Sequence, residues 1–200
     1  MSKALDIYKK SISSTHSLSE MYAYMEKQVV PFDIMNLLRA EYVMIVSAFD
    51  TYFHNCVLLQ MLEMFGGSKN KSKGFENFEI PLSTICAILE DDNPITRTGL
   101  LQNAIRKINE NDSFQGPQSI EYATSLMGLK GIWKRLSEEL GLSCDSIKTE
   151  LSLIIRRRNQ IAHESDIDYD TGEKREMLLD DVARARKFLT MIVEQIDTWL

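Results

Sequence analysis

The chain has 200 residues, of which 44% are hydrophobic and 26% are charged, with only 9 Gly and 4 Pro. This length can bury the core of one domain, and the composition excludes a disordered or fibrous chain. The formal net charge of −6 excludes a generally polycationic protein, so a nucleic acid must bind through a local basic patch.

The first part of the chain has apolar residues at helical spacing. Leu5, Tyr8 and Ile12 predict a helix near the N-terminus. Residues 17–20, Ser-Leu-Ser-Glu, have the pattern of a capping box, which predicts a helix start at that point.

A long second helix is predicted over residues 34–65. Pro31 breaks the chain before it, Asp33 is a candidate N-cap, and Gly66 and Gly67 end it. Its apolar residues recur at steps of three and four: Leu38, Tyr42, Ile45, Phe49, Tyr52, Cys56 and Leu59. Polar residues interrupt this run, so we expect a buried helix of a soluble protein and no membrane span.

The middle of the chain predicts shorter helices. Residues 68–74 are polar and lysine-rich, which indicates a flexible loop inserted within one domain. Helical spacing then predicts helices over residues 81–90, 95–109 and 117–140, the last with a break near residues 128–131.

The last part of the chain predicts two further helices. One begins at Asp145 or Ser146 and runs to about His163, and an acidic loop follows over residues 165–173. The final helix is predicted from about Lys174 to the C-terminus, with a narrow apolar seam formed by Leu178, Val182, Ala185, Leu189, Ile192, Ile196 and Trp199. Because no alternating strand pattern persists, we predict an all-α bundle that forms a single domain over residues 1–200.

Three isolated cysteines, Cys56, Cys86 and Cys144, lie in apolar helical stretches. An odd number at wide spacing argues against a disulfide framework or a zinc site and fits reduced thiols. The first ten residues contain no long apolar run, so no secretory signal is expected. Together these features predict a cytoplasmic protein.

The strongest candidates for functional residues lie in residues 151–163, which read Leu-Ser-Leu-Ile-Ile-Arg-Arg-Arg-Asn-Gln-Ile-Ala-His. On a helix, Arg158 lies on the same apolar face as Ile154, whereas Arg156 and Arg157 need not. A guanidinium on a packing face is costly unless it is paired, hydrogen-bonded or open to a wet cleft. This position distinguishes Arg158 from its neighbours.

Asn159 and His163 share a helix face one turn apart, but His163 lies about 140° around the helix from Arg158. Arg158 and His163 can meet over one substrate only if the helix ends near His163, the arginine bends, or a second subunit completes the site. The alternative interpretation is a solvated basic helix end with a capping histidine, which the helix dipole favours.

Arg158, Asn159 and His163 lie late in an all-α chain and before one last long helix. The segment Arg-Asn-Gln-Ile-Ala-His resembles the motif of the HEPN superfamily, and the chain is similar to its RiboL-PSP branch. Three further stretches support the similarity: residues 48–53, 113–117 and 131–136. The resemblance implies an all-α HEPN-like helical bundle with a long second helix and a long C-terminal helix.

The resemblance also implies metal-independent RNA cleavage, in which the ribose 2′-OH attacks phosphorus and leaves a 2′,3′-cyclic phosphate. His163 would act as general base or acid, Arg158 would hold the phosphate, and Asn159 would orient either group. HEPN sites are usually composite sites of a homodimer. The implied biological role is a toxin of a toxin–antitoxin pair or an anti-phage effector, with an antitoxin or defence-system protein as a further partner.

Other residues are supporting candidates. Asp50 lies on the long second helix, where a carboxylate among apolar neighbours needs a partner, and it is expected to orient the histidine or the arginine. Basic residues expected to contact RNA phosphates are Arg156, Arg157, Lys69, Lys71 and Lys73. No metal site and no cofactor motif is expected.

Two alternatives to a ribonuclease stay open at this point. One is a non-catalytic HEPN module that binds RNA or a partner protein, which the acidic composition favours because an RNase benefits from positive potential. The other is an unrelated helical bundle with a chance motif.

Overall fold

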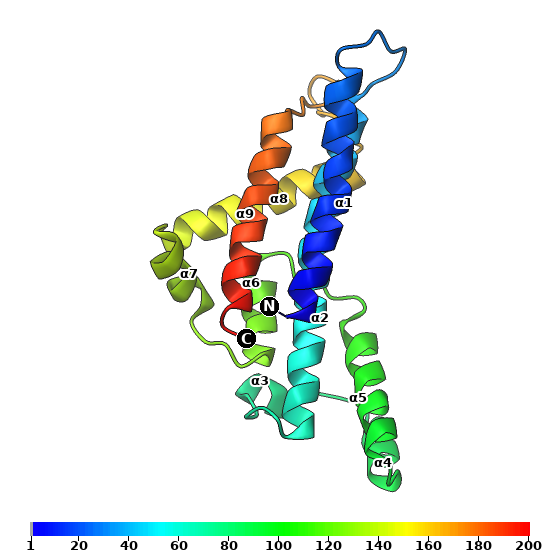
Figure 1. Cartoon of the computed structure of the whole chain (residues 1–200), viewed down its shortest axis with the longest axis vertical. Coiled ribbons are helices and arrows are strands. Elements are labelled where there is room, and N and C mark those ends of the chain that lie inside the picture. Colours follow the sequence, from blue (N-terminus) through cyan, green and yellow to red (C-terminus); the bar gives the residue numbers. More distant parts are fainter. Residues whose placement is uncertain (1) are drawn as a thin grey trace.

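The computed structural model describes residues 2–200, and these residues form an all-α fold (Figure 1). In this part of the chain there are nine helices: α1 (Lys3–Met25), α2 (Met35–Gly66), α3 (Lys73–Glu76), α4 (Leu82–Glu90), α5 (Pro94–Asn109), α6 (Pro117–Leu126), α7 (Ile132–Leu140), α8 (Cys144–His163) and α9 (Leu179–Asp197). The all-α prediction is confirmed, as are the long second helix and the long C-terminal helix.

Helix α2 is the axis of the fold. It packs against α1, α5, α6, α8 and α9. Its fully buried side chains include Ile45, Phe49 and Phe53. The N-cap is Ile34, one residue after the predicted Asp33, and the Asp33 carboxylate accepts a hydrogen bond from the Met35 amide at 2.9 Å in the turn before the helix. Gly67, in the left-handed conformation with φ +81°, ends the helix.

The length and composition of α2 are sufficient for a membrane span, with a mean hydropathy of 1.2 in its most apolar window. More than half of that window, 56%, is buried inside the fold. The helices packed around α2 therefore account for its apolar character.

Helix α1 runs without interruption alongside α2 (Figure 1). The predicted helix start at residues 17–20 is therefore wrong. The Ser17 hydroxyl donates to the Ser14 carbonyl within the helix at 2.8 Å, and the buried Ser19 hydroxyl donates to the Glu41 carboxylate. Serines that cap helices are also tolerated inside them when the hydroxyl has such a partner.

A buried ion pair joins α1, α2 and α9. The Glu41 side chain is fully buried and accepts from the Arg186 guanidinium as well as from Ser19. Near the chain ends, the Ser2 amide donates to the Asp197 carboxylate at 3.0 Å, which brings the start of α1 beside the end of α9 (Figure 1).

At the other end of α2, helices α3 and α6 pack together, and α4 and α5 form an arm beside α2 (Figure 1). The segment expected to be a flexible loop, residues 68–74, ends inside α3. There Gly74 lies so close to α6 that an added Cβ would be 2.6 Å from the Ser125 carbonyl oxygen. The second half of this segment is therefore fixed by packing.

Helix α8 runs across α2 and α9 in the view of Figure 1 and packs against α2, α6 and α7, and its buried residues are Ile147, Leu151 and Ile154. Helix α9 begins at Leu179 rather than at Lys174. The preceding residues are extended, since Lys174 pairs with Ile167 in an antiparallel bridge, and Leu178 is half exposed. The other members of the predicted seam up to Ile196 are buried.

Candidate active site

The end of α8 is defined by a left-handed turn directly after His163. The Gln160 carbonyl accepts from the Glu164 amide at 3.1 Å and from the Asp166 amide at 3.0 Å, which satisfies it at the helix end. Ser165 and Asp166 have φ values of 54° and 59°, the left-handed region in which Asp is one of the better-tolerated residues. His163 is thus the last residue of the helix, and its side chain is exposed.

The three motif residues lie together on the C-terminal end of α8. Arg158 is half-buried and donates from Nη1 to the Asn159 side-chain oxygen at 2.9 Å, whereas Asn159 and His163 are exposed. The Arg158 Nε is shielded from solvent and has no hydrogen-bond partner within residues 2–200. No hydrogen bond or ion pair joins Arg158 to His163 in the described chain.

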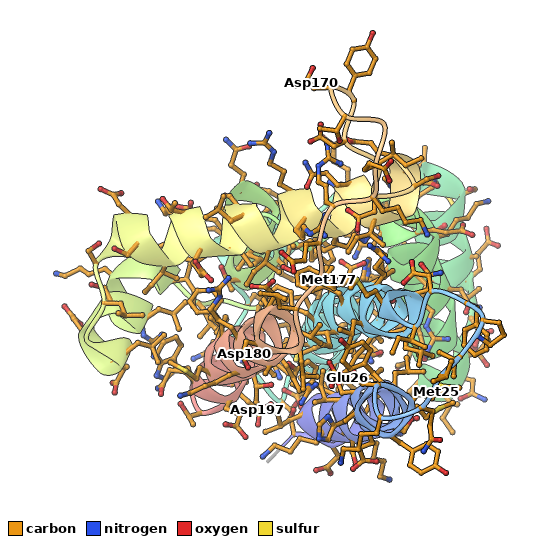
Figure 2. The ribbon with its side chains drawn as sticks, turned by 90° about the horizontal axis from the view of Figure 1, so that it is seen from above. Met25, Glu26, Asp170, Met177, Asp180 and Asp197 are labelled. Atoms are coloured by element: carbon orange, nitrogen blue, oxygen red, sulfur yellow. The ribbon has the colours of Figure 1, made fainter. Side chains whose placement is uncertain are left out.

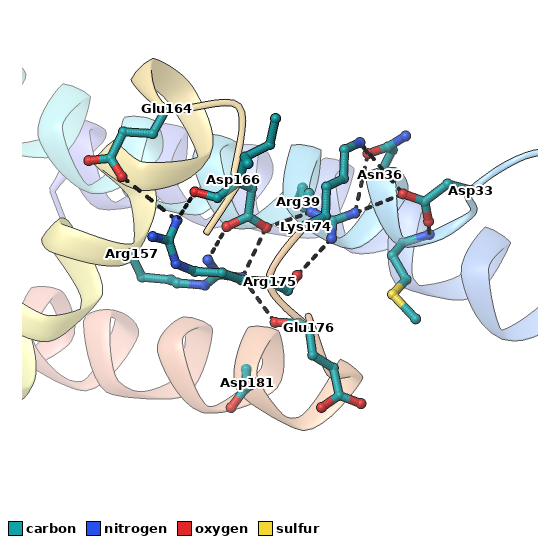
Figure 3. Close-up of polar contacts among 12 residues, drawn as sticks. Asp33, Asn36, Arg39, Arg157, Glu164, Asp166, Lys174, Arg175, Glu176 and Asp181 are labelled. Atoms are coloured by element: carbon teal, nitrogen blue, oxygen red, sulfur yellow. Dashed lines mark hydrogen bonds and ion pairs between the residues drawn. The ribbon is translucent and has the colours of Figure 1, made fainter. Parts of the chain in front are cut away.

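The buried ion pair of this helix is made by Arg157, not by Arg158. Arg157 donates from both Nη atoms to the Asp166 carboxylate, the Nη2 contact being 3.0 Å, and Nη2 also donates to the Glu176 carbonyl at 3.0 Å (Figure 3). Its guanidinium is paired within the fold and only partly exposed, which disfavours the expected RNA contact. The segment after α8 folds back over this face, which sequence spacing alone does not reveal.

Asp166 is fully buried between two arginines, Arg157 from α8 and Arg39 from α2 (Figure 3). Arg39 is 5% exposed and donates from Nε to Asp166 at 2.6 Å and from Nη2 to the Arg175 carbonyl at 2.8 Å. Its Nη1 reaches the Asp33 carboxylate at 3.0 Å. This buried carboxylate therefore fastens the turn after His163 to both helices. We call Asp166, Arg39 and Arg157 the Asp166 cluster.

The loop between α8 and α9 is a small hairpin. The Asp168 amide donates to the Glu173 carbonyl at 2.8 Å, and the Arg175 amide donates to the Asp166 carbonyl at 2.8 Å. Seen from above in Figure 2, Asp170 lies at the outer tip of this hairpin, away from the helices. The expected acidic loop is thus ordered at its base and exposed at its tip.

A cavity of about 220 Å³ lies beside Arg157, between α2, α8 and α9. Arg184 in its wall pairs with Glu150 at 3.8 Å and with Asp181 at 3.1 Å. Burial raises the pKa of Tyr42, another wall residue, to about 12, so its phenol stays neutral near pH 7 and is not a general base.

Asp50 does not contact the motif. Its carboxylate accepts from the Phe114 amide at 2.6 Å and lies 3.8 Å from the His54 Nε2. The expectation that Asp50 orients Arg158 or His163 is therefore corrected. The half-buried carboxylate does have a partner, the Phe114 amide in the connection before α6.

The remaining basic candidates are divided between the two ends of the molecule. Arg156 is exposed on α8 beside the motif. Lys69, Lys71 and Lys73 follow α2 and lead into α3, at the opposite end of α2 from the Asp166 cluster (Figure 1). The structure does not bring these lysines to the motif.

A family model of RiboL-PSP-HEPN domains matches residues 5–200. The chain belongs to this family, a branch of the HEPN superfamily. HEPN domains are generally associated with ribonuclease activity and often act on RNA as dimers. Neither the curated proteins nor the solved structures contain a match to the chain.

In this HEPN chain, no group of three or more His, Cys, Asp or Glu side chains that could hold a metal ion is found within residues 2–200. The polar groups at the end of α8 are instead a guanidinium, an amide and an imidazole. This donor set suits phosphate binding and proton transfer.

The sequence did not single out Asp166 and Arg39, which hold the turn after the candidate site. Arg39 lies one helical turn before Tyr42 and two before Val46, on the inward face of α2. A guanidinium in an apolar stripe requires a buried anion, so this signal was available. The identity of the anion was not, because Asp166 looks like any other member of an acidic loop.

Proposed function

We propose that this HEPN protein is a metal-independent endoribonuclease whose active residues are Arg158, Asn159 and His163. The observation that carries the proposal is the family match, which spans residues 5–200. The position of the motif at an exposed helix end supports it. The Asp166 cluster supports it, because it holds the turn after His163 in one conformation.

The chemistry needs two proton transfers and one phosphate clamp. A neutral His163 accepts the proton of the ribose 2′-OH while that oxygen forms a bond to the adjacent phosphorus. The bond from phosphorus to the 5′ oxygen breaks, and a protonated imidazole donates its proton to that oxygen. The products are a 2′,3′-cyclic phosphate and a 5′-OH. Arg158 neutralises the charge that develops on the phosphate oxygens.

One protomer supplies only one histidine at the motif and does not bring it to Arg158. Five residues on a helix separate two side chains by about 140° and about 7.5 Å of rise. A homodimer that pairs two α8 ends would provide the second imidazole and place it near an arginine. Within residues 2–200 the half-buried Arg158 guanidinium donates only from Nη1, to Asn159, so its Nη2 is left to bind a phosphate in such a site.

We further propose a cytoplasmic role as a toxin or anti-phage effector, in which a partner protein restrains or triggers cleavage. An unregulated ribonuclease with an exposed motif would damage the RNA of its own cell. An antitoxin or a defence-system protein is the class of partner that fits this requirement.

The test is a cleavage assay on mixed cellular RNA in excess EDTA. It compares the wild type with Arg158→Ala, His163→Ala and the control Arg106→Ala, which removes an exposed arginine of α5 that forms no ion pair within residues 2–200. Wild type and control should cleave equally, and the two motif variants should lose activity by about 100-fold or more. Mass spectrometry of the products should show 2′,3′-cyclic phosphate ends.

Two further outcomes would count against the proposal. Equal cleavage by all four proteins would exclude the motif as the active site. RNA binding without cleavage by a folded wild type would favour the non-catalytic module. The dimer is tested by dilution, since specific activity should fall together with the dimer fraction measured by analytical ultracentrifugation.

A further inference from the structure

A second cationic feature lies at the far end of α2 from the motif. A cavity of about 470 Å³ is bounded by the segment before α3, by α3 itself and by the α6–α7 connection. Four lysines line it, together with one carboxylate: Lys69, Lys71, Lys73, Lys130 and Glu76. We call this the lysine cavity. Its charged wall residues sum to +3, whereas the whole chain carries −6.

The lysines of this cavity have no carboxylate partner. Within residues 2–200, none of the four lies within ion-pair distance of an Asp or Glu. Lys69 donates instead to the neutral Gln60 side chain. The cavity beside Arg157 differs, because its Arg184 is paired with Glu150 and Asp181. Unpaired cations that line a cavity attract an anion from outside the chain.

The segment that carries the lysines is held in place before any ligand arrives. The Ser72 hydroxyl donates to the Leu126 carbonyl at 3.1 Å and accepts from the Phe75 amide at 2.9 Å. Gly74 sits against the Ser125 carbonyl with no room for a Cβ. Two segments 54 positions apart are thus joined beneath the lysines, so binding an anion there does not require ordering a free loop.

We propose that the lysine cavity binds the backbone phosphates of an RNA strand, as a site separate from the cleavage motif. This inference rests on the proposed ribonuclease function and names where its substrate is held. Lysine ammonium groups act as point charges on phosphates and read no base sequence. From Arg39 to Gly66, α2 spans about 40 Å, so a bound strand at the cavity adds affinity without touching the reacting atoms.

The test measures RNA binding without cleavage. Fluorescence anisotropy follows a labelled single-stranded RNA with 2′-O-methyl riboses, which lack the attacking hydroxyl, at several salt concentrations in EDTA. All proteins carry His163→Ala. The test variant adds Lys71→Ala, Lys73→Ala and Lys130→Ala. The control adds Lys3→Ala, Lys10→Ala and Lys187→Ala, three exposed lysines in no ion pair within residues 2–200.

The slope of log K against log salt is negative, and the loss of three phosphate contacts on a single strand should reduce its magnitude by about 2. The control should keep the parental slope. Equal slopes for the test variant and the control would overturn the proposal. So would a parental protein that binds no RNA, or one that binds ATP at this cavity as tightly as the RNA strand, because the site would then serve a free nucleotide.

Failure of this inference is distinguishable from failure of the proposed function. If no assay detects cleavage but the lysine substitutions still change the salt slope, the ribonuclease proposal is wrong and the RNA-binding proposal stands. If the wild-type background cleaves a natural RNA, the three lysine substitutions should raise KM several-fold and leave kcat unchanged, because the cavity lies far from His163. An unchanged KM with a lowered kcat would contradict a binding role.

Discussion

The two ends of α2 treat charge in opposite ways. At its N-terminal end, Asp166 is buried between Arg39 and Arg157, and every group of this cluster has a partner within the chain (Figure 3). At its C-terminal end, the lysine cavity has four cations and no ion pair in the described residues, and its framework is held by packing at Gly74. Paired and buried charge fixes a conformation, whereas unpaired and exposed charge is available to a ligand.

This difference assigns different tasks to the two ends in the proposed enzyme. The Asp166 cluster fixes the turn that ends α8 and thereby the position of His163. The lysine cavity has no such structural duty, because its lysines can be removed without leaving a buried charge alone. Substitutions at the two ends should therefore differ in kind, with stability affected at one end and binding at the other.

The largest effect is expected from Asp166→Ala. It leaves Arg39 and Arg157 without their shared anion in a buried position and puts an alanine at a φ of 59°. Removing one partner of a buried ion pair destabilises a protein by about 3–5 kcal/mol. Chemical denaturation should show a loss of the free energy of unfolding of this size.

The matched control is Asp170→Ala, an exposed carboxylate in the same hairpin (Figure 2). Its stability should equal that of the wild type. Asp166→Asn should fall between the two, because Asn tolerates the left-handed conformation and keeps hydrogen-bond acceptance but loses the charge. An Asp166→Ala protein as stable as the Asp170→Ala control would show that the cluster does not fix the turn.

The second effect concerns the packing that supports the lysine cavity. Gly74→Ala places a Cβ 2.6 Å from the Ser125 carbonyl oxygen and 2.8 Å from its carbon, both backbone atoms of α6. Overpacking of this kind costs about 1–3 kcal/mol. Thermal unfolding should report a lower Tm, and Gly99→Ala on α5, where nothing lies within 4 Å, should not lower it. If both variants have the wild-type Tm, α3 is not held against α6.

The sequence was sufficient to predict most helices of the fold. The apolar steps from Leu38 to Leu59 predicted α2, and Gly66 and Gly67 predicted its end, because local spacing and glycine conformation decide both. The motif Arg158-Asn159 with His163 was placed correctly on the last turns of α8. These features depend on residues near one another in the chain.

What the sequence did not reveal depends on contacts between distant segments. Arg39 donates a hydrogen bond to Asp166, which is 127 positions away in the sequence. The Phe114 amide donates to the Asp50 carboxylate, which is 64 positions away. No local pattern encodes such pairs. The start of α9 was predicted five residues early for the same reason, since Lys174 is drawn into a bridge with Ile167 that spacing within one helix does not show.

The smallest effect, and the one with the most informative sign, is expected from Lys71→Ala with Lys73→Ala. Removing two of four unpaired like charges should leave the free energy of unfolding unchanged or raise it, by no more than about 0.5 kcal/mol. Salt should abolish any gain, because repulsion between exposed charges is screened. Thermal unfolding at low and high salt measures this directly.

A clear loss of stability would mean that the lysines hold the fold together, and the two ends of α2 would then not differ in the way proposed. A neutral or stabilising result, together with weaker RNA binding, is what a site kept for a ligand should give, because its charges contribute only when the ligand is present.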